Sequence, residues 1–224
     1  MTKGFSLVEL SIVLVILGLL TGGILAGQSL IRAAELRSVS TEYGRFQTAV
    51  HTFQDKYFAI PGDFDIAHRF WDPAGGSGVV GDGCEAATGS GTETCSGDGD
   101  GMLDKPGGVS EYGETFTFWQ HLNNAGLLEG SYTGITGAGG ITDHILGENS
   151  PMSKLSNAVW AIGYWDNSTG TGTWNFSLDY GNFFAVGAMT STAEGDVPVG
   201  LGFKTEEAWI LIRKWMTACQ DREK

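Results

Sequence analysis

The chain begins with one long run of apolar positions. No charged residue occurs from Leu10 to Ile31, a stretch of 22 residues. As a helix, this stretch would be about 33 Å long, which is enough to cross the hydrocarbon core of a bilayer. A secretory signal peptide usually has a shorter apolar core, followed by a cleavage site of small residues. Here the run continues directly into an amphipathic pattern, so the sequence predicts a retained membrane-spanning helix.

Beyond this run, apolar residues recur every three or four positions, which is the period of an amphipathic helix. No Pro interrupts residues 5–60, and Pro61 and Gly62 then end the pattern. We therefore predict one helix from Phe5 to about Phe58, about 80 Å long. A coiled-coil dimer would fit the same stripe, but its aromatic residues and the Trp-rich segment that follows favour packing within the chain. The stripe consists of Leu36, Val39, Tyr43, Phe46, Val50, Phe53 and Tyr57.

The second half of the chain contains patterns typical of β-strands. Residues 173–180 alternate most cleanly between apolar and polar side chains, and residues 158–165 and 183–189 are two further candidates. The links at 166–172 and 181–182 suit hairpins. We therefore predict an antiparallel sheet of at least three strands, packed on the long helix.

Shorter helices and a loop complete the predicted head. Residues 66–71 and 114–128 have helical patterns, and a final helix begins at Thr205. Residues 73–110 form a Gly-rich segment with little periodicity, and a loop of this length is usually functional, cross-linked or metal-bound. One face of the final helix carries Trp209, Ile212, Met216 and Cys219.

Composition narrows the class of protein. Glycine accounts for 35 of 224 residues, but it has no three-residue period, which excludes a collagen-like chain. Seven Trp, twelve Phe and six Tyr can fill a core. The formal net charge of −13 repels phosphate, so binding to nucleic acid is not expected.

Three cysteines occur, at positions 84, 95 and 219. Cys84 and Cys95 flank a short polar stretch, and neither lies at zinc-site spacing. We predict a disulfide between them if the head lies outside the cytoplasm, and two free thiols if it lies in a reducing compartment. We expect Cys219 to be packed rather than reactive.

The loop also contains a candidate calcium site. Its segment Ser-Gly-Asp-Gly-Asp-Gly-Met-Leu-Asp is similar to the first nine positions of an EF-hand-like loop. Ser96, Asp98, Asp100 and Asp104 take the oxygen positions, but position 12 is Gly107 rather than a bidentate Glu. The alternative is a solvated acidic loop. Missing ligands could come from outside the segment, from Asp82, Glu111 or Glu114.

Catalytic motifs are missing from the sequence. It has no Gly-x-Ser-x-Gly elbow and no phosphate-binding loop between a strand and a helix. We expect His121 to be a capped or exposed surface residue rather than a base. Asp98 and Asp100 are flanked by glycines that would hold an acid/base pair poorly. We therefore predict that the protein is not an enzyme.

Residues 4–10, Gly-Phe-Ser-Leu-Val-Glu-Leu, add a specific motif at the N-terminus. A short basic leader, a Gly before a Phe, and a Glu five residues into the new chain precede an unbroken apolar helix. This pattern resembles the start of the type IV prepilin family, which includes the pseudopilins of type II secretion. The resemblance covers about 25 residues.

The resemblance implies processing and a role for the acidic residue. A prepilin peptidase would cut between Gly4 and Phe5, and the new amino group of Phe5 would be N-methylated. Glu9 would pair with the Phe5 amine of a neighbouring subunit. A carboxylate–ammonium pair costs far less in hydrocarbon than either charge alone, so the pair would fix the register of assembly.

The resemblance also implies a pilin-like α+β fold, with a long helix packed on an antiparallel sheet. The expected divisions are a leader (1–4), a transmembrane half-helix (5–31), an amphipathic half-helix (32–60) and a head (61–224) that includes the Gly-rich loop 73–110. The protein would be anchored once in the bacterial inner membrane, in contact with lipid, with its head in the periplasm. It would then assemble into a fibre.

Two functions fit this organisation. One is a structural subunit of a type IV pilus or secretion pseudopilus, whose partners are other pilin-like subunits, the prepilin peptidase and an inner-membrane assembly platform. The alternative is a membrane-anchored binding module, such as an adhesin-like or carbohydrate-binding minor subunit. An anchored periplasmic enzyme is a weaker third option.

Overall fold

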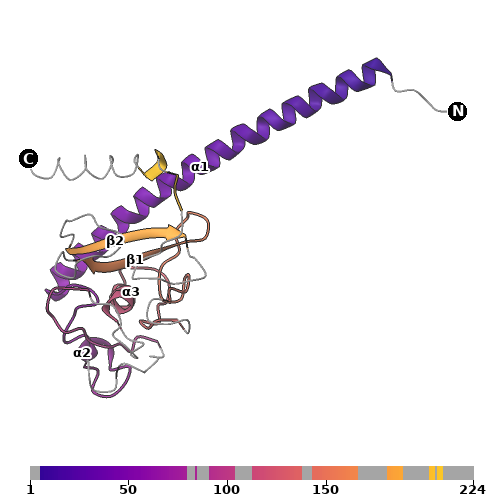
Figure 1. Cartoon of the computed structure of the whole chain (residues 1–224). Helices are drawn as coiled ribbons and strands as arrows, with labels where there is room; N and C mark the ends of the chain where they lie inside the picture. Colours follow the sequence, from indigo (N-terminus) through magenta and orange to yellow (C-terminus); the bar gives the residue numbers. More distant parts are fainter. Residues whose placement is uncertain are drawn as a thin grey trace, which may run out of the picture.

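One long helix, α1 (Leu7–Tyr57), organises the molecule. Its C-terminal half lies along the head, and its N-terminal half projects beyond the head (Figure 1). The 51 residues form one continuous helix, which confirms the helix that the sequence predicts. The computed structural model describes residues 6–79, 84, 91–103, 113–137, 143–165, 181–188, 202–204 and 206–208.

The apolar stripe of α1 faces the head as predicted. Val39, Phe46 and Phe53 repeat at intervals of seven residues and are buried. The helix ends at Tyr57 because Phe58 takes a left-handed conformation with φ 57°, in the C-terminal position that usually breaks a helix. The other four stripe residues are partly buried against the same core: Leu36, Tyr43, Val50 and Tyr57.

Two antiparallel strands form the sheet of the described residues, β1 (Ala158–Trp165) and β2 (Gly181–Ala188). Two of the three predicted strands are therefore confirmed, with β2 beginning two residues earlier than expected. The third predicted strand, 173–180, lies outside the described residues.

The register of the sheet corrects one predicted turn. Gly181 and Asn182 are not a hairpin turn, because both pair with the end of β1 as strand residues. Direct pairing of the two strands places Trp160 opposite Val186 and Ile162 opposite Phe184. All four side chains then join the core, which favours this register over the predicted turn.

Two further helices and one helical turn are described. α2 (His68–Trp71) is the short helix predicted after the turn, and α3 (Glu114–Asn124) contacts both α1 and β1. α3 ends four residues before the predicted position 128, because Gly126 has φ 74° and cannot continue the helix. Residues 206–208 are helical, in agreement with a predicted final helix from Thr205.

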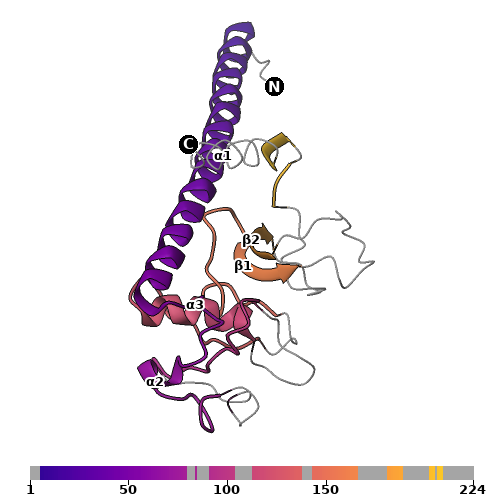
Figure 2. The same ribbon diagram turned by 90° about the vertical axis from the view of Figure 1, so that its left-hand side faces the viewer.

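The core lies where α1, α3 and the sheet meet (Figure 2). Phe46 stands at its centre, with its ring 5.2 Å from the ring of Trp119 on α3 and 5.2 Å from that of Trp160 on β1. The ring of Phe184 on β2 lies 6.2 Å from Phe46. Aromatic contacts thus attach both the sheet and α3 to one face of α1.

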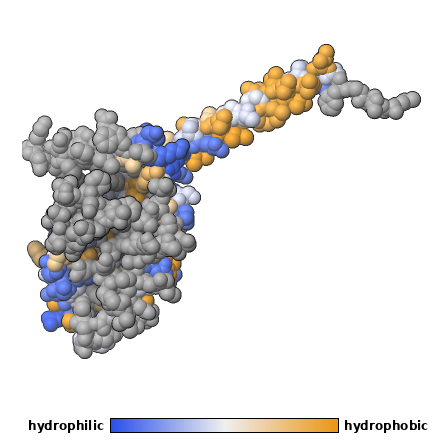
Figure 3. Space-filling model, viewed as in Figure 1, coloured by the Kyte–Doolittle hydropathy of each residue, from blue (hydrophilic) through white to orange (hydrophobic). Residues whose placement is uncertain are grey.

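None of the other described elements packs over the projecting half of α1. Its apolar side chains are exposed, and the projecting helix has a predominantly hydrophobic surface (Figure 3). Among the described residues, α1 is the one helix that is long and apolar enough to cross a membrane.

Candidate functional site

The start of α1 has a complete helix cap. The Ser6 hydroxyl accepts a hydrogen bond from the Val8 N–H at 3.3 Å, and the Ser6 N–H donates to Glu9 Oε2 at 3.0 Å. Glu9 therefore caps its own helix, in the first turn, where the helix dipole favours a negative charge. Gly4 and Phe5, the predicted cleavage and methylation residues, lie outside the described residues.

The hydroxyl groups in the apolar half of α1 form hydrogen bonds within the helix. The hydroxyls of Ser11, Thr21 and Ser29 each donate to a backbone carbonyl of the same helix, at 2.8–2.9 Å. The helix also continues unbroken through Gly22 and Gly23. A helix surrounded by lipid has no water to bond with, so its hydroxyl groups need hydrogen-bond partners within the helix.

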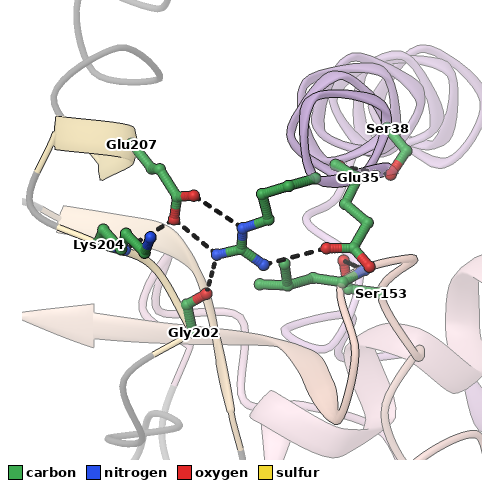
Figure 4. A network of polar contacts seen from close by, with 8 residues as sticks. Glu35, Ser38, Ser153, Gly202, Lys204 and Glu207 are labelled. Atoms are coloured by element: carbon green, nitrogen blue, oxygen red, sulfur yellow. Dashed lines mark hydrogen bonds and ion pairs between the residues drawn. The ribbon is translucent and has the colours of Figure 1, made fainter. Parts of the chain in front are cut away.

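A charged network marks the end of the apolar half (Figure 4). The Arg32 guanidinium donates to both carboxylate oxygens of Glu207, at 2.8 and 2.6 Å, and to the Gly202 carbonyl at 2.8 Å. A further bond of 3.1 Å reaches Glu35. These bonds lower the pKa of Glu207 to about 2 and raise the pKa of Arg32. The network therefore ties the segment around residue 207 to α1.

Three carboxylates meet in the head. Oxygens of Asp63, Asp98 and Asp100 lie within 4.8 Å of one another. Asp63 is buried and accepts hydrogen bonds from the N–H groups of Gly99 at 2.5 Å and Gly101 at 2.7 Å. Burial raises the pKa of Asp63, although these two bonds oppose the rise. Hard cations prefer such carboxylate oxygens, so this cluster could bind a metal ion.

Neighbouring elements hold the acidic loop in place. A Glu114 carboxylate oxygen at the start of α3 accepts from the Asp98 N–H at 3.0 Å. From β2, the Asn182 side chain accepts from the Leu103 N–H at 3.0 Å and donates to the Gly101 carbonyl at 2.8 Å. The cluster is thus supported by side chains from α3 and from β2, and β2 lies about 80 residues further along the chain.

The cluster differs from the ligand set that the sequence predicts. Asp98 and Asp100 come together as expected, but the Ser96 hydroxyl lies 2.7 Å from His68 Nδ1, and Asp104 lies outside the described residues. Asp63, which sequence reasoning missed, completes the group. It lies 35 positions before Asp98, and no spacing motif links the two residues.

The predicted disulfide is present. Cys84 and Cys95 are bonded, with their Cα atoms 5.9 Å apart, and both are buried. The bond closes an eleven-residue separation within the Gly-rich loop. Such a cross-link stabilises the fold mainly by restricting the unfolded chain.

His121 on α3 is buried, so the expectation that it lies at the surface is wrong. Its Nδ1 accepts from the Gly62 N–H at 2.9 Å, and its Nε2 lies 3.1 Å from the Cys95 carbonyl. This pairing places the proton of the neutral ring on Nε2. Its ring stacks 5.5 Å from that of Trp71. Burial lowers the pKa of His121 to about 4, so it joins three segments as a neutral residue.

Comparison with known proteins identifies the N-terminal motif. Residues 1–25 match the family described as the prokaryotic N-terminal methylation motif. No curated protein and no solved structure matches the chain. The match confirms the resemblance to type IV pilins and pseudopilins, of which this motif is typical.

With the long apolar helix and the small sheet, this motif defines a pilin-like α+β architecture. Proteins of this class are typically non-enzymatic structural subunits. The motif and the helix suggest anchoring in the inner membrane before assembly.

Proposed function

We propose that this protein is a structural subunit of a type IV pilus or secretion pseudopilus. The observation that supports this most directly is the methylation motif at the start of a continuous 51-residue helix. The first half of that helix is exposed and apolar, while the second half is packed under the head. A helix of this kind anchors the subunit in a membrane first and fills the centre of a fibre later.

In this proposal, processing and assembly depend on the first residues of the chain. Prepilin peptidase removes residues 1–4, and the amine of Phe5 is methylated. The Glu9 carboxylate, which caps its own helix in the isolated chain, then pairs with the Phe5 amine of a neighbouring subunit. A subunit docked out of register leaves a charge unpaired in an apolar environment, which disfavours wrong positions.

The mass of the N-terminal peptide of protein purified from its own cells tests this proposal. Loss of residues 1–4 together with one added methyl group on Phe5 is the expected result. An intact Met1, or a cut after the apolar run, would contradict the proposal. The membrane-anchored binding module, or a secreted head, would then be the better explanation.

Replacing Glu9 by Val should leave the protein inserted in the membrane but stop its assembly. The neighbour's ammonium would then be unpaired, at a cost of about 2.5–3.5 kcal/mol, which corresponds to about a 100-fold loss of incorporation. Sheared-filament fractions and membrane fractions, probed for the protein, measure both effects. Thr21→Val, which also removes a polar side chain from this half of α1, should assemble normally. Normal incorporation of Glu9→Val would exclude the register role.

We also propose that the cation bound by the acidic cluster is Ca²⁺. Asp63, Asp98 and Asp100 supply carboxylate oxygens, which suit calcium better than softer metals, and the support from α3 and β2 keeps them close together. Asp104 remains a proposed further ligand. A bound divalent ion would offset the mutual repulsion of these carboxylates and order the glycine-rich segment around them.

Calcium should therefore raise the melting temperature of the full chain in detergent micelles. Saturation at 100 times the dissociation constant would stabilise the fold by about 2.7 kcal/mol. The double variant Asp98→Ala, Asp100→Ala should lose this shift, while Asp55→Ala, which removes an exposed carboxylate from α1, should keep it. Scanning calorimetry with and without calcium measures the shift. If the unmodified protein melts at the same temperature with and without calcium, the proposed calcium site does not exist.

A further inference from the structure

One edge of β2 is unpaired in the described part of the chain. There β2 pairs with β1 alone, and no other backbone hydrogen bond reaches residues 182–188. In an antiparallel pair, alternate residues of each strand direct their N–H and C=O groups away from the partner strand. The side of β2 that faces away from β1 therefore presents a row of backbone donors and acceptors to which another strand can bond.

The unpaired edge of β2 also lacks the usual protection. Edge strands in natural proteins are commonly guarded by charged residues, by Pro or by a bulge. Residues 182–188 have the sequence Asn-Phe-Phe-Ala-Val-Gly-Ala, with no charge and no Pro. They pair with β1 residue for residue, without a bulge. An edge of this kind is well suited to pairing with an added strand.

A groove lies beside this edge, between β2 and α1. Its volume is about 350 Å³, and it is lined by Tyr43, Gln47, Val50 and His51 from α1 and by residues 182–184 from β2. None of these residues belongs to β1, so the groove opens on the unpaired side of β2. None is acidic, and none is Lys or Arg. An added strand would therefore find a pocket for one large apolar side chain next to the free edge.

The groove has an acidic loop at the end where β2 begins. The Asn182 side chain lines the groove, donates to the Gly101 carbonyl and accepts from the Leu103 N–H. The same loop carries Asp98 and Asp100, which lie close to the buried Asp63. Three carboxylates keep a net negative charge even when one divalent ion is bound. Charge complementarity thus favours a segment that is uncharged along the groove and basic at this end.

We propose that the unpaired edge of β2 and the groove beside it bind an extended segment of a different protein. The backbone of the segment pairs with residues 182–186 and adds a strand to the sheet. One large apolar side chain of the segment enters the groove, against Val50 and Phe184. A basic residue at one end lies beside Asp98 and Asp100. Main-chain bonds give such a complex its affinity, and the side-chain pocket gives it specificity.

The β2 strand of a second copy is a poor occupant. β2 lies along α1, because its start shares the groove with His51 and its end lies next to Gly202, which bonds to Arg32. Antiparallel pairing of two β2 strands would therefore point the two α1 helices in opposite directions. Two subunits anchored in one membrane cannot adopt that arrangement. Only this exclusion rests on the anchoring in the proposed function, whereas binding of a different protein does not.

A synthetic peptide tests the proposal with the full chain in detergent micelles, without added calcium. The peptide Thr-Val-Thr-Phe-Thr-Val-Lys is uncharged along the strand, with one large apolar side chain and a terminal Lys. The anisotropy of a fluorophore on the peptide measures binding, and nuclear magnetic resonance measures deuterium exchange at the β2 amides. We expect about half of the amides of residues 182–188 to exchange rapidly in the free protein and to become protected when the peptide binds.

Two N-methylated forms of the peptide separate strand pairing from non-specific apolar binding. One form carries methyl groups on the amides of its odd-numbered residues, and the other on those of its even-numbered residues. Only one set of amides can face β2, so one form should bind at least about tenfold more weakly than the other. Equal affinities of the two forms would overturn the proposed strand pairing.

Charge variants test the acidic end of the groove. A peptide ending in Glu instead of Lys should bind about tenfold more weakly. Asp98→Asn with Asp100→Asn should remove this preference. Glu129→Gln with Glu148→Gln, which removes two exposed carboxylates from another part of the head, should keep it. An unchanged preference in the Asp98/Asp100 variant would overturn the proposed charge contact.

The exchange data also identify the other possible occupants of the edge. Full protection of the β2 amides without peptide, unchanged on dilution, would show that a segment of this chain covers the edge. Protection that falls on dilution would show that a second copy covers it. Either result would overturn the proposal, as would the absence of binding by the Lys peptide at about 1 mM.

Discussion

Replacing Glu42 by Ala should destabilise the head by about 3 kcal/mol. Glu42 lies on α1 and accepts three hydrogen bonds, from the Ser153 hydroxyl at 2.8 Å, the Lys154 N–H at 2.9 Å and the Trp160 indole N–H at 2.8 Å. Trp160 is fully buried, so its donor would lose its partner without gaining water. Bonds to a charged acceptor are stronger than neutral ones, and an unpaired buried donor adds its own cost.

Urea unfolding of the full chain in detergent micelles, followed by tryptophan fluorescence, measures this loss. Glu42→Gln should cost less, because the amide oxygen still accepts a hydrogen bond. Thr41→Ala is the matched control, since Thr41 is exposed and its hydroxyl bonds only to a carbonyl of its own helix. We expect the control to lie within about 0.5 kcal/mol of the unmodified protein. Equal unfolding midpoints for Glu42→Ala and the control would show that these bonds make no net contribution to the free energy of unfolding.

Lowering the pH from 6.5 to 4 should reduce the free energy of unfolding by up to about 3 kcal/mol through His121 alone. Its pKa is lowered from 6.5 to about 4 in the folded protein because the ring is buried. Within this window the unfolded chain binds a proton that the folded chain does not, so protonation favours unfolding. The stabilising contribution is complete above pH 6.5 and is lost as the pH falls toward 4.

Comparison with His121→Gln isolates this residue. The variant cannot titrate in this window, so its free energy of unfolding should change less between pH 6.5 and 4. Asp63 acts in the opposite direction, because its raised pKa favours the folded protein as the carboxyl is protonated. That contribution is common to both proteins and cancels in the difference between them. Identical pH dependence in the two proteins would contradict the assigned role of His121.

The long helix could be predicted in detail because its signals are local. The uncharged run, the seven-residue repeat of Val39, Phe46 and Phe53, and the break at Pro61 all lie within one continuous segment. Alternation of apolar and polar residues predicts the two strands, but it does not predict how they pair. Gly181 and Asn182 are typical turn residues in sequence, whereas the structure uses them as strand residues because the core requires Phe184 to face Phe46.

For the candidate sites too, features within one short segment could be predicted, and contacts between distant segments could not. The disulfide could be predicted because its two cysteines flank one short polar stretch. The pairing of Glu9 with a neighbouring subunit stays a prediction. The acidic cluster could be predicted only in part, because Asp63 reaches it from the segment after α1. The burial of His121 could not be foreseen, because it depends on Gly62, Cys95 and Trp71, which come from three different segments. Sequence patterns report periodicity within an element but not which elements meet.

The direction of the aromatic stripe on α1 determines how the head would respond to a pulling force. The stripe runs parallel to the helix axis, and the buried residues Val39, Phe46 and Phe53 extend over four turns. Tension applied along the axis at the N-terminal end would load all these contacts together in shear, rather than peeling them apart one after another. Contacts loaded together resist more force than contacts broken singly. The geometry that attaches the head to α1 is therefore also suited to a subunit that is extracted from a membrane by its helix.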